Sequence, residues 1–383
     1  DAQESRGLGD VYKRQEHIAI EECCDILDSR RIPITASDRM SGPYPYYGAN
    51  GVQDYVADYI FDDELVLLAE DGGNFGSKTR PIAYRVSGKC WVNNHAHVLK
   101  PMASMDVDYL CYSLMFYDTG ELVNGATRQK LTQTAMRKIL IPQRSLQEQK
   151  RIVCELSKVQ SIISARQQQL QKLDELVKAR FIELFGDPLG NDKGWQKALI
   201  AEVCNAIFGG GTPSKSHPEY FAGSIPWVSP KDMKSSVIND SIDHITEDAI
   251  AHSTTNLVPA NSVLMVIRSG ILKHTLPVAI NSLPVTINQD MKAFVPNETV
   301  KTAFLLYFFK AIENDVLAGV RGVTADNIDF KAFQKRTIIV PPLALQEQFV
   351  AFVTQTDKSK VAVQKALDEA QLLFDSLMQK YFG

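Results

Sequence analysis

Two histidines stand where a metal ion could bind. His95 and His97 are two residues apart in the run Asn94-His95-Ala96-His97, so a strand would put both imidazoles on one face. Imidazole nitrogens are common zinc ligands, but a zinc site needs three or four protein ligands. The sequence shows no cysteine or carboxylate constellation that completes such a set. We therefore expect no bound metal, and assign these side chains to polar contacts with a ligand or to hydrogen bonds within the core.

A second candidate for chemistry is the acidic pair Glu70-Asp71, which precedes two glycines and could supply a general acid and base. The second half of the chain carries Arg268-Ser269-Gly270 at the equivalent place. Two copies of one domain with opposite charges at one place would not share a catalytic mechanism. They could, however, recognise different ligands at the same site.

Other catalytic motifs are incomplete or absent. The segment Phe208–Thr212 is rich in glycine and follows an apolar run, but it lacks the Gly-Lys-Ser/Thr ending of a phosphate-binding loop. The sequence contains neither the Asn/Asp-Pro-Pro-Tyr/Phe motif of methyltransferases, nor helicase motifs, nor the carboxylate–lysine set of nucleases. We therefore expect the chain to be non-catalytic.

The composition is that of a globular protein large enough for two domains. The 383 residues are 45% hydrophobic and 22% charged, with 41 Lys and Arg against 45 Asp and Glu, for a net charge of −4. No apolar run reaches the roughly 18 residues of a membrane-spanning helix. The six cysteines are sparse and form no Cys-x-x-Cys pair. We therefore expect no membrane association, and reduced thiols that fit a cytoplasmic protein.

An internal repeat organises the chain. The segments Ile139–Pro142 and Leu146–Gln149 recur as Ile338–Pro342 and Leu345–Gln348, with the two Leu-Gln-Glu-Gln runs offset by 199 residues. Each copy precedes a long stretch in which apolar residues recur at spacings of three and four, which is typical of a coiled coil. Because proline disfavours helix just before it, each helix is predicted to start near its Leu-Gln-Glu-Gln run. Two such helices in one chain favour an antiparallel pair.

The predicted fold class is α+β. Two mixed α/β domains, rich in short β-branched and aromatic runs, would be separated by two long antiparallel coiled-coil helices in a pseudo-two-fold internal repeat. The expected segments are a first domain at 16–141, a first helix at 142–186, a linker at 187–195, a second domain at 196–341 and a second helix at 342–383. Residues 1–15 show no apolar period and no strand run, so we expect them to be non-native or disordered.

Several motifs resemble those of the specificity (S) subunits of type I restriction–modification systems. In the first half they are Arg31-Ile32-Pro33-Ile34, the run Gly42–Gly51 (Gly-Pro-Tyr-Pro-Tyr-Tyr-Gly-Ala-Asn-Gly), Glu70-Asp71-Gly72 and Trp91–His97. In the second half they are Gly209–Lys215, Tyr220-Phe221 and Ile225–Val228. The Gln-Glu-Gln runs with their long helices resemble the conserved spacer regions of that family. The resemblance covers residues 16–383, whereas Asp1–Gln15 departs from the family's usual opening.

The resemblance implies a DNA sequence-recognition subunit. The domains at 16–141 and 196–341 would be target recognition domains, each binding one half of a split site in double-stranded DNA. Because the two domains differ in sequence, the two half-sites should differ, which gives an asymmetric bipartite target. The alternative interpretation is a standalone DNA-modifying or DNA-cleaving enzyme with an unrecognised site.

The resemblance also implies partners. Two modification (methyltransferase) subunits would dock on the helices, and restriction (endonuclease/translocase) subunits would join the complex. S-adenosylmethionine, ATP and Mg would be bound by those partner subunits, so the chain itself is expected to carry no cofactor.

Candidate contact residues follow from residue type and position. Ten residues are candidates for DNA contacts: Arg268, Gln289, Asn94 and His95 are polar groups beside glycine or asparagine turns, and the others belong to local clusters of basic residues or to the aromatic stretch beside one. The ten residues are Arg31, Arg39, Tyr46, Tyr47, Asn94, His95, Lys215, Lys231, Arg268 and Gln289. On the helices, apolar residues expected beyond the intramolecular seam are candidates for contacts with modification subunits. They are Phe181, Ile182, Phe349 and Phe352.

Overall fold

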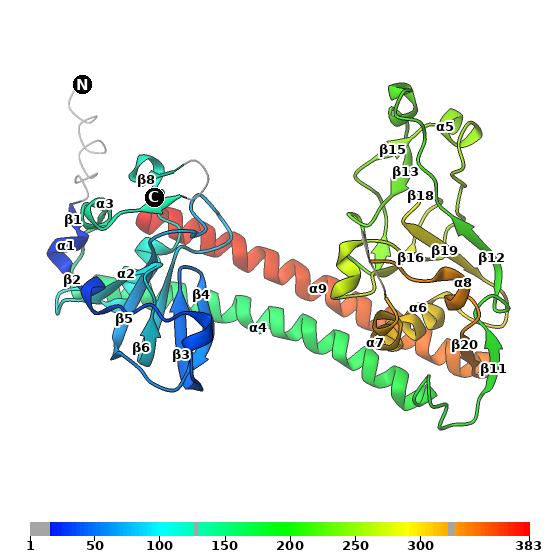
Figure 1. Cartoon of the computed structure of the whole chain (residues 1–383), viewed down its shortest axis with the longest axis horizontal. Coiled ribbons are helices and arrows are strands. Elements are labelled where there is room, and N and C mark those ends of the chain that lie inside the picture. The colour runs from blue at the N-terminus through cyan, green and yellow to red at the C-terminus, as the bar shows by residue number, and fades with distance from the viewer. Residues whose placement is uncertain (1–15, 126–128, 321–325) are drawn as a thin grey trace, which may run out of the picture. The chain divides into compact units, whose positions relative to one another are not determined.

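The structure is a computed structural model that describes residues 16–125, 129–320 and 326–383 (Figure 1). The expectation for residues 1–15 lies outside the described residues. The chain divides into two compact units: unit 1 comprises Asp1–Arg166 and Ala366–Gly383, and unit 2 comprises Gln167–Lys365. Among the helices of the described ranges, none combines the length and the apolar character needed to cross a membrane.

Unit 1 is built on a six-stranded sheet. Its elements are β1 (His17–Ala19), α1 (Ile20–Cys23), β2 (Cys24–Ile26), β3 (Ser41–Gly48), β4 (Gly51–Val56), β5 (Phe61–Ala69), β6 (Ala83–Val92), β7 (Ala96–Pro101), α2 (Val107–Met115), β8 (Val123–Asn124), β9 (Lys130–Leu131), α3 (Gln133–Arg137) and β10 (Leu140–Pro142). The strand order is β2-β7-β5-β6-β3-β4, and only the β3–β6 pair is parallel.

The central strand β5 shows how this sheet forms. Its residues alternate between the two faces, so Val66 and Leu68 join a core with α2 while Leu65 and Leu67 join a separate core on the other side. All four side chains are fully buried. A run of consecutive apolar residues is therefore required here, because both faces of this strand are covered.

Unit 2 is built on a five-stranded sheet and a three-stranded sheet. Its elements are β11 (Gln196–Leu199), β12 (Cys204–Gly209), β13 (Ile225–Val228), β14 (Val237–Ile238), β15 (His244–Ile245), α5 (Glu247–Ala251), β16 (Val263–Val266), β17 (Val278–Asn281), β18 (Thr286–Ile287), β19 (Met291–Pro296), α6 (Thr302–Ala311), α7 (Glu313–Ala318), α8 (Phe330–Phe333) and β20 (Thr337–Val340). The strand orders are β12-β19-β16-β17-β14 and β15-β13-β18. The apolar stretch Thr302–Ala311 forms the buried helix α6, which packs on β16, β17 and β19.

In each unit the first and last strands of the globular segment pair with each other. In unit 1, β1 pairs antiparallel with β10, and in unit 2, β11 pairs antiparallel with β20. Each segment is thus closed on itself immediately before a long helix begins.

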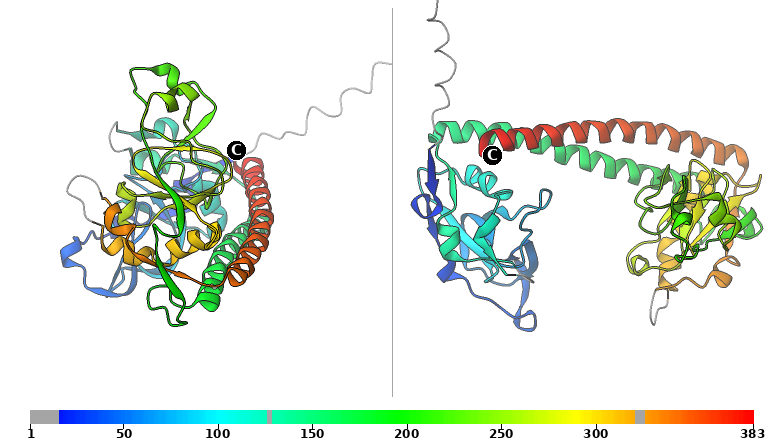
Figure 2. Two further views of the ribbon diagram at one scale, coloured as in Figure 1. Left: turned by 90° about the vertical axis from the view of Figure 1, so that its right-hand side faces the viewer. Right: turned by 90° about the horizontal axis from the view of Figure 1, so that it is seen from above.

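The two long helices are α4 (Leu146–Phe185) and α9 (Leu343–Phe382), each of 40 residues. Within each unit, the α4 and α9 portions lie side by side (Figure 2). In unit 1, the Tyr381 hydroxyl of α9 donates to the Glu155 carboxylate of α4. In unit 2, Lys360 of α9 pairs with Asp174 of α4 at 2.7 Å. Because later residues of α4 meet earlier residues of α9, the pairing is antiparallel, as predicted.

The repeat offset read from the sequence needs a correction. The helices begin at Leu146 and Leu343, a separation of 197 residues (343 − 146), whereas the Leu-Gln-Glu-Gln runs match at 199. A shift of two residues turns a side chain by about 200° around a helix. Consequently Gln149 is buried whereas Gln348, its counterpart by letters, is exposed, and the buried counterpart is Gln346. The two long helices therefore correspond at an offset of 197 residues, although their identical Leu-Gln-Glu-Gln residues match at 199.

Candidate nucleic-acid interface

Two hollows open on unit 2, on either side of the segment Asn288–Asp290 between β18 and β19. One has a volume of about 750 Å³ and is lined by Lys215, Pro218, Phe221, Trp227, Ser229, Pro230, Lys231, Asp243, Ser269, Asn288 and Asp290. The other has a volume of about 920 Å³ and is lined by Ile267, Arg268, Gln289, Lys292, Gly319, Asn327, Ile328, Asp329, Phe330 and Lys331. Lysines and one arginine share these walls with aspartates, asparagines and aromatic rings, a mixture suited to a polar, anionic ligand.

The segment between the hollows is organised by one carboxylate. Asp290 accepts a hydrogen bond from Arg268 Nε on Oδ1 at 2.6 Å, and from Asn288 Nδ2 on Oδ2 at 3.2 Å. Its backbone carbonyl accepts the N–H groups of Ile267 and Arg268 at 2.8 and 3.2 Å. Three polar side chains that follow buried strands are therefore held in one cluster.

The glycine-rich run Gly209–Gly211 has a steric role here. A Cβ atom at Gly210 would lie 1.7 Å from the carbonyl oxygen of Asn288, so only glycine permits this approach. Gly211 donates its N–H to Ile287 and accepts from Trp227 Nε1 at 3.0 Å in both cases. The run thus supports the segment between the hollows.

Four predicted DNA-contacting residues lie at these hollows. Lys215 and Lys231 are exposed on the wall of the 750 Å³ hollow, and Arg268 and Gln289 line the 920 Å³ hollow. The Arg268 side chain is 47% exposed. Thr212 donates a hydrogen bond to Gln289 Oε1, which links the glycine run to this group. The sequence pattern did not single out Asn288 or Asp290, although both directly flank Gln289.

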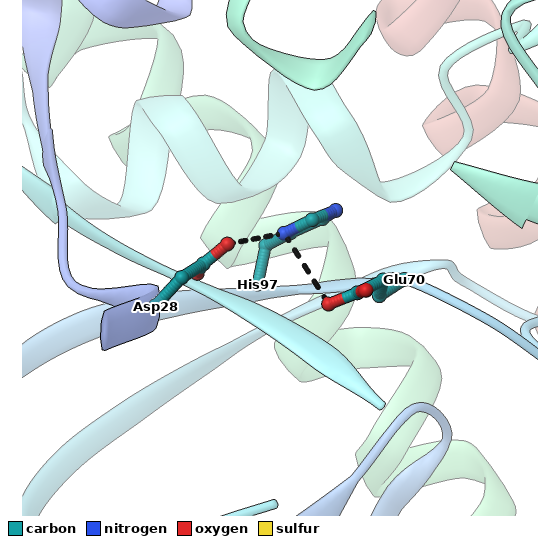
Figure 3. A group of neighbouring side chains, drawn as sticks. All are labelled: Asp28, Glu70 and His97. Carbon is teal, nitrogen blue, oxygen red and sulfur yellow. Dashed lines mark hydrogen bonds and ion pairs between the residues drawn. The ribbon is translucent and has the colours of Figure 1, made fainter. Parts of the chain in front are cut away.

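In unit 1, the carboxylates of Asp28 and Glu70 and the imidazole of His97 form one cluster, although they lie far apart in the sequence (Figure 3). His97, on β7, lies 2.7 Å from Asp28 through Nδ1 and donates through Nε2 to the carbonyl of Leu131 at 2.9 Å. Glu70, just after β5, lies 3.7 Å from the same Nδ1. Burial alone would raise the pKa of Asp28, but hydrogen bonds from His97, the Val98 N–H and Gln133 outweigh it and leave the pKa lowered.

The ligand atoms of Asp28, Glu70 and His97 lie within 4.8 Å of one another, so the cluster has the residue types of a metal site. Each carboxylate is, however, already paired with cations or donors. Glu70 accepts from Arg31 at 2.5 Å and from Lys130 at 3.1 Å, and Asp28 accepts from Val98 and Gln133 at 2.9 Å. This arrangement favours a structural ion network.

The same network also holds Arg31, whose assignment to DNA stays a prediction. Its side chain is 13% exposed, and it bonds Glu70, Asp28 and the carbonyl of Ala96. A guanidinium with these partners has little capacity left for a ligand. Arg31 therefore ties the chain before β3 to β5 and β7.

The other unit 1 candidates divide by exposure. Asn94 is exposed at the turn between β6 and β7, beside the partly exposed His95, whose Nδ1 lies 2.6 Å from Asp71. The two histidines thus meet different carboxylates. Both assignments to DNA stay predictions.

The tyrosine assignments differ in outcome. Tyr46 is 1% exposed, and its hydroxyl exchanges hydrogen bonds with the backbone of Ile34, so it is a core residue and its assignment to DNA is corrected. The guanidinium carbon of Arg39 lies 4.2 Å from the centre of the Tyr46 ring, and its Nη1 lies 3.2 Å from Oδ2 of Asp54. Tyr47 is half-buried, and burial raises its pKa. Arg39 and Tyr47 stay predictions.

The partner-binding candidates on the long helices also divide. Phe181 is 2% exposed and Phe349 is fully buried, and their rings lie 5.5 Å apart within the core of unit 2. The expectation that they face a partner is therefore wrong, because the intramolecular seam already covers them. Ile182, by contrast, is 48% exposed, and Phe352 is half-buried beside Arg180.

Comparison with known proteins points to a single family for both halves of the chain. The family model for the type I restriction modification DNA specificity domain matches twice, at residues 13–175 and 192–370. The chain is 40% identical over 153 residues to the type I restriction enzyme EcoR124I/EcoR124II specificity subunit of Escherichia coli. It is 37% identical over 134 residues to the putative type I restriction enzyme specificity subunit S.HindORF215P of Haemophilus influenzae. These matches cover 39% and 35% of this chain, but only 38% and 34% of those relatives.

Solved structures share the fold along nearly the whole chain. The S subunit of a type I restriction–modification system from M. genitalium matches with a TM-score of 0.59 and 14% identity, over 96% of both chains. A chain from a study of complex assembly and conformational transition of the type I R-M system matches with a TM-score of 0.53 and 18% identity, over 96% of this chain and 97% of that one. With the family model matched over both halves, the chain belongs to the type I restriction modification DNA specificity family.

Proposed function

We propose that this chain is the DNA sequence-recognition subunit of a type I restriction–modification complex. The observation that carries the proposal is the double family match, one copy in each half of the chain. The relatives from E. coli and H. influenzae are named as specificity subunits of type I restriction enzymes, and their matched segments reach 40% and 37% identity. The same role accounts for two globular segments that each precede a long helix.

We propose further that each unit reads its own half of an asymmetric bipartite target in double-stranded DNA. Unit 2 offers two hollows whose walls carry Arg268, Gln289, Lys215 and Lys231. Arginine and glutamine forks suit base edges, and lysines suit phosphates. Unit 1 has a six-stranded sheet where unit 2 has sheets of five and three strands, so different half-sites are expected.

The chain is also proposed to assemble with two modification subunits and with restriction subunits. S-adenosylmethionine, ATP and Mg would then bind to those subunits, and the isolated chain would have no methyltransferase, nuclease or ATPase activity. The net charge of −4 supports tight DNA binding only within the complex, because phosphate neutralisation supplies much of the affinity of a free-standing DNA-binding protein.

The test is to reconstitute the full chain with modification subunits and to map the sites that the complex methylates on random-sequence duplex DNA. Two fixed, different half-sites separated by a constant gap of unspecified bases are expected. Methylation without sequence preference would contradict the proposal. Turnover of S-adenosylmethionine or ATP by the chain alone would favour the standalone enzyme instead.

A further inference from the structure

The side chain of Arg268 is fixed at one end and open at the other. Its Nε donates to Asp290 at 2.6 Å, and Arg268 makes no other side-chain hydrogen bond within the described ranges. The two terminal nitrogens are therefore available as a pair of parallel donors. Nearly half of the side chain is exposed, at the wall of the 920 Å³ hollow.

The backbone on both sides of this arginine is also fixed. The N–H groups of Ile267 and Arg268 both bond the carbonyl of Asp290. On the other side, Arg268 forms an antiparallel bridge with Asn327, and Ile328 donates to the carbonyl of Ile267 at 2.9 Å. Because Cα and Nε are both held, few rotamers of Arg268 remain. Most of the conformational entropy of this long side chain is therefore already lost before a ligand binds.

The charge of Asp290 decides which ligand the open end suits. A phosphate would approach a nearly neutral ion pair instead of a free cation, and would meet a carboxylate close by. The release of counterions that favours phosphate binding would then be small. Recognition of a base edge depends on directed hydrogen bonds, so the pairing of Arg268 with Asp290 weakens it much less.

Among base edges, guanine fits the open end of Arg268. In the major groove guanine presents two adjacent acceptors, O6 and N7, which match two parallel N–H donors. Adenine presents one acceptor beside an amino donor, so it would place donor against donor. Cytosine and thymine each present a single polar group there.

We propose that Asp290 is a positioning and specificity-determining residue, which holds Arg268 as a two-donor fork for one guanine of the half-site read by unit 2. This inference rests on the proposed function and adds the base and the residue that enforces it. Asn288 Nδ2, at 3.2 Å from the second oxygen of Asp290, keeps the carboxylate turned toward Arg268.

The test uses the full chain in complex with modification subunits, and base preference is measured at every position by methylation of a randomised duplex pool. Asp290→Ala and Arg268→Ala should each reduce guanine preference at one and the same position, by about 5- to 150-fold. The double variant should be no worse than Arg268→Ala alone. The half-site read by unit 1 should not change.

Two further variants separate positioning from general damage. Asp290→Asn keeps an acceptor for Nε but removes the charge, so it should retain most of the guanine preference. The affinity of this variant for non-target DNA should fall more steeply as the salt concentration rises. The slope of log affinity against log salt should change by about 0.9, which corresponds to one phosphate contact. Asp243→Ala removes another carboxylate from the hollows without touching Arg268, and should leave that guanine position unchanged.

Several outcomes would overturn the inference. One is a uniform loss of affinity in Asp290→Ala over all sequences. Another is a change at a different position from that of Arg268→Ala, and a third is no change in preference at all. If Asp290→Ala fails to fold, loss of guanine preference in a folded Asp290→Asn with an unchanged salt slope would also overturn it. A wild-type complex with no sequence preference would instead refute the proposed function.

Discussion

Gln149 and Gln346 make the same three hydrogen bonds in the two units. Gln149 Oε1 accepts from the Asp106 N–H at 2.7 Å, and its Nε2 donates to the carbonyls of Ser104 and Arg144 at 3.0 and 2.9 Å. Gln346 repeats this pattern with Lys301, Thr299 and Pro341 at 2.8, 3.0 and 2.8 Å. Asp106 and Lys301 are the residues just before α2 and α6. Each glutamine therefore fastens the first turn of a long helix to the globular segment beside it.

Replacing these glutamines should destabilise the units separately. Gln149→Ala leaves a buried N–H and two carbonyls without partners, which costs about 1–3 kcal/mol. Amide hydrogen exchange should accelerate at Asp106 in this variant, and at Lys301 in Gln346→Ala. The matched controls are Gln147→Ala and Gln348→Ala, at exposed positions of the same motif. Equal effects at the buried and exposed positions would contradict the assignment.

The buried carboxylate Asp28 should make unit 1 sensitive to acid. Its pKa is lowered in the folded chain, so its stabilisation is present above the unfolded pKa and is lost as the pH falls through the folded value. Asp28→Asn should therefore lower the unfolding free energy at pH 7 by roughly 1–3 kcal/mol. The difference from wild type should shrink below about pH 4. Denaturant titrations at several pH values, with the exposed Asp25→Asn as control, measure this; a difference that grows in acid would refute it.

Two adjacent residues of α4 should respond differently to substitution. Ile182→Asp should prevent co-purification of a modification subunit without changing the thermal unfolding of the chain, because Ile182 is 48% exposed. Phe181→Ala should instead destabilise unit 2 by about 3–5 kcal/mol, because it empties part of the core. Leu189→Asp, at an equally exposed site after α4, is the control and should still capture the subunit. Unchanged capture by Ile182→Asp would remove Ile182 from the partner surface.

The glycine run should control the half-site read by unit 2. Gly210→Ala places a methyl group against the carbonyl of Asn288, so the segment 288–290 must shift, at a cost of about 1–3 kcal/mol. We expect weaker base preference in one half-site only, measured by methylation mapping. Gly270→Ala is the control, because a Cβ there meets nothing within 4 Å. Equal base preference in the two variants would contradict this role.

The sequence predicted the elements better than their side-chain environments. The spacing of apolar residues in α4 and α9 was sufficient for two helices, because a helix imposes that period locally. The burial of Tyr46 and Phe181 was not predictable, since it depends on how other segments pack against them, such as those that carry Ile34 and Phe304. The role of Asp290 was not predictable for a similar reason, because its partner Arg268 lies in another connection between strands.

We propose that each unit chooses the bases of its own half-site, whereas α4 and α9 set the gap between the half-sites. This proposal is tested by inserting four residues after Arg166 in α4 and four after Lys365 in α9, at the boundary between the units. Each helix should lengthen by about 6 Å. Because a base pair rises about 3.4 Å, the gap should grow by one or two base pairs. Arg268→Ala serves as the converse, and should change one base preference but not the gap.

Methylation mapping of the insertion variant in complex with modification subunits is the decisive measurement. We expect a target with both half-sites unchanged and a gap longer by one or two base pairs. An unchanged gap, or different bases in either half-site, would contradict it.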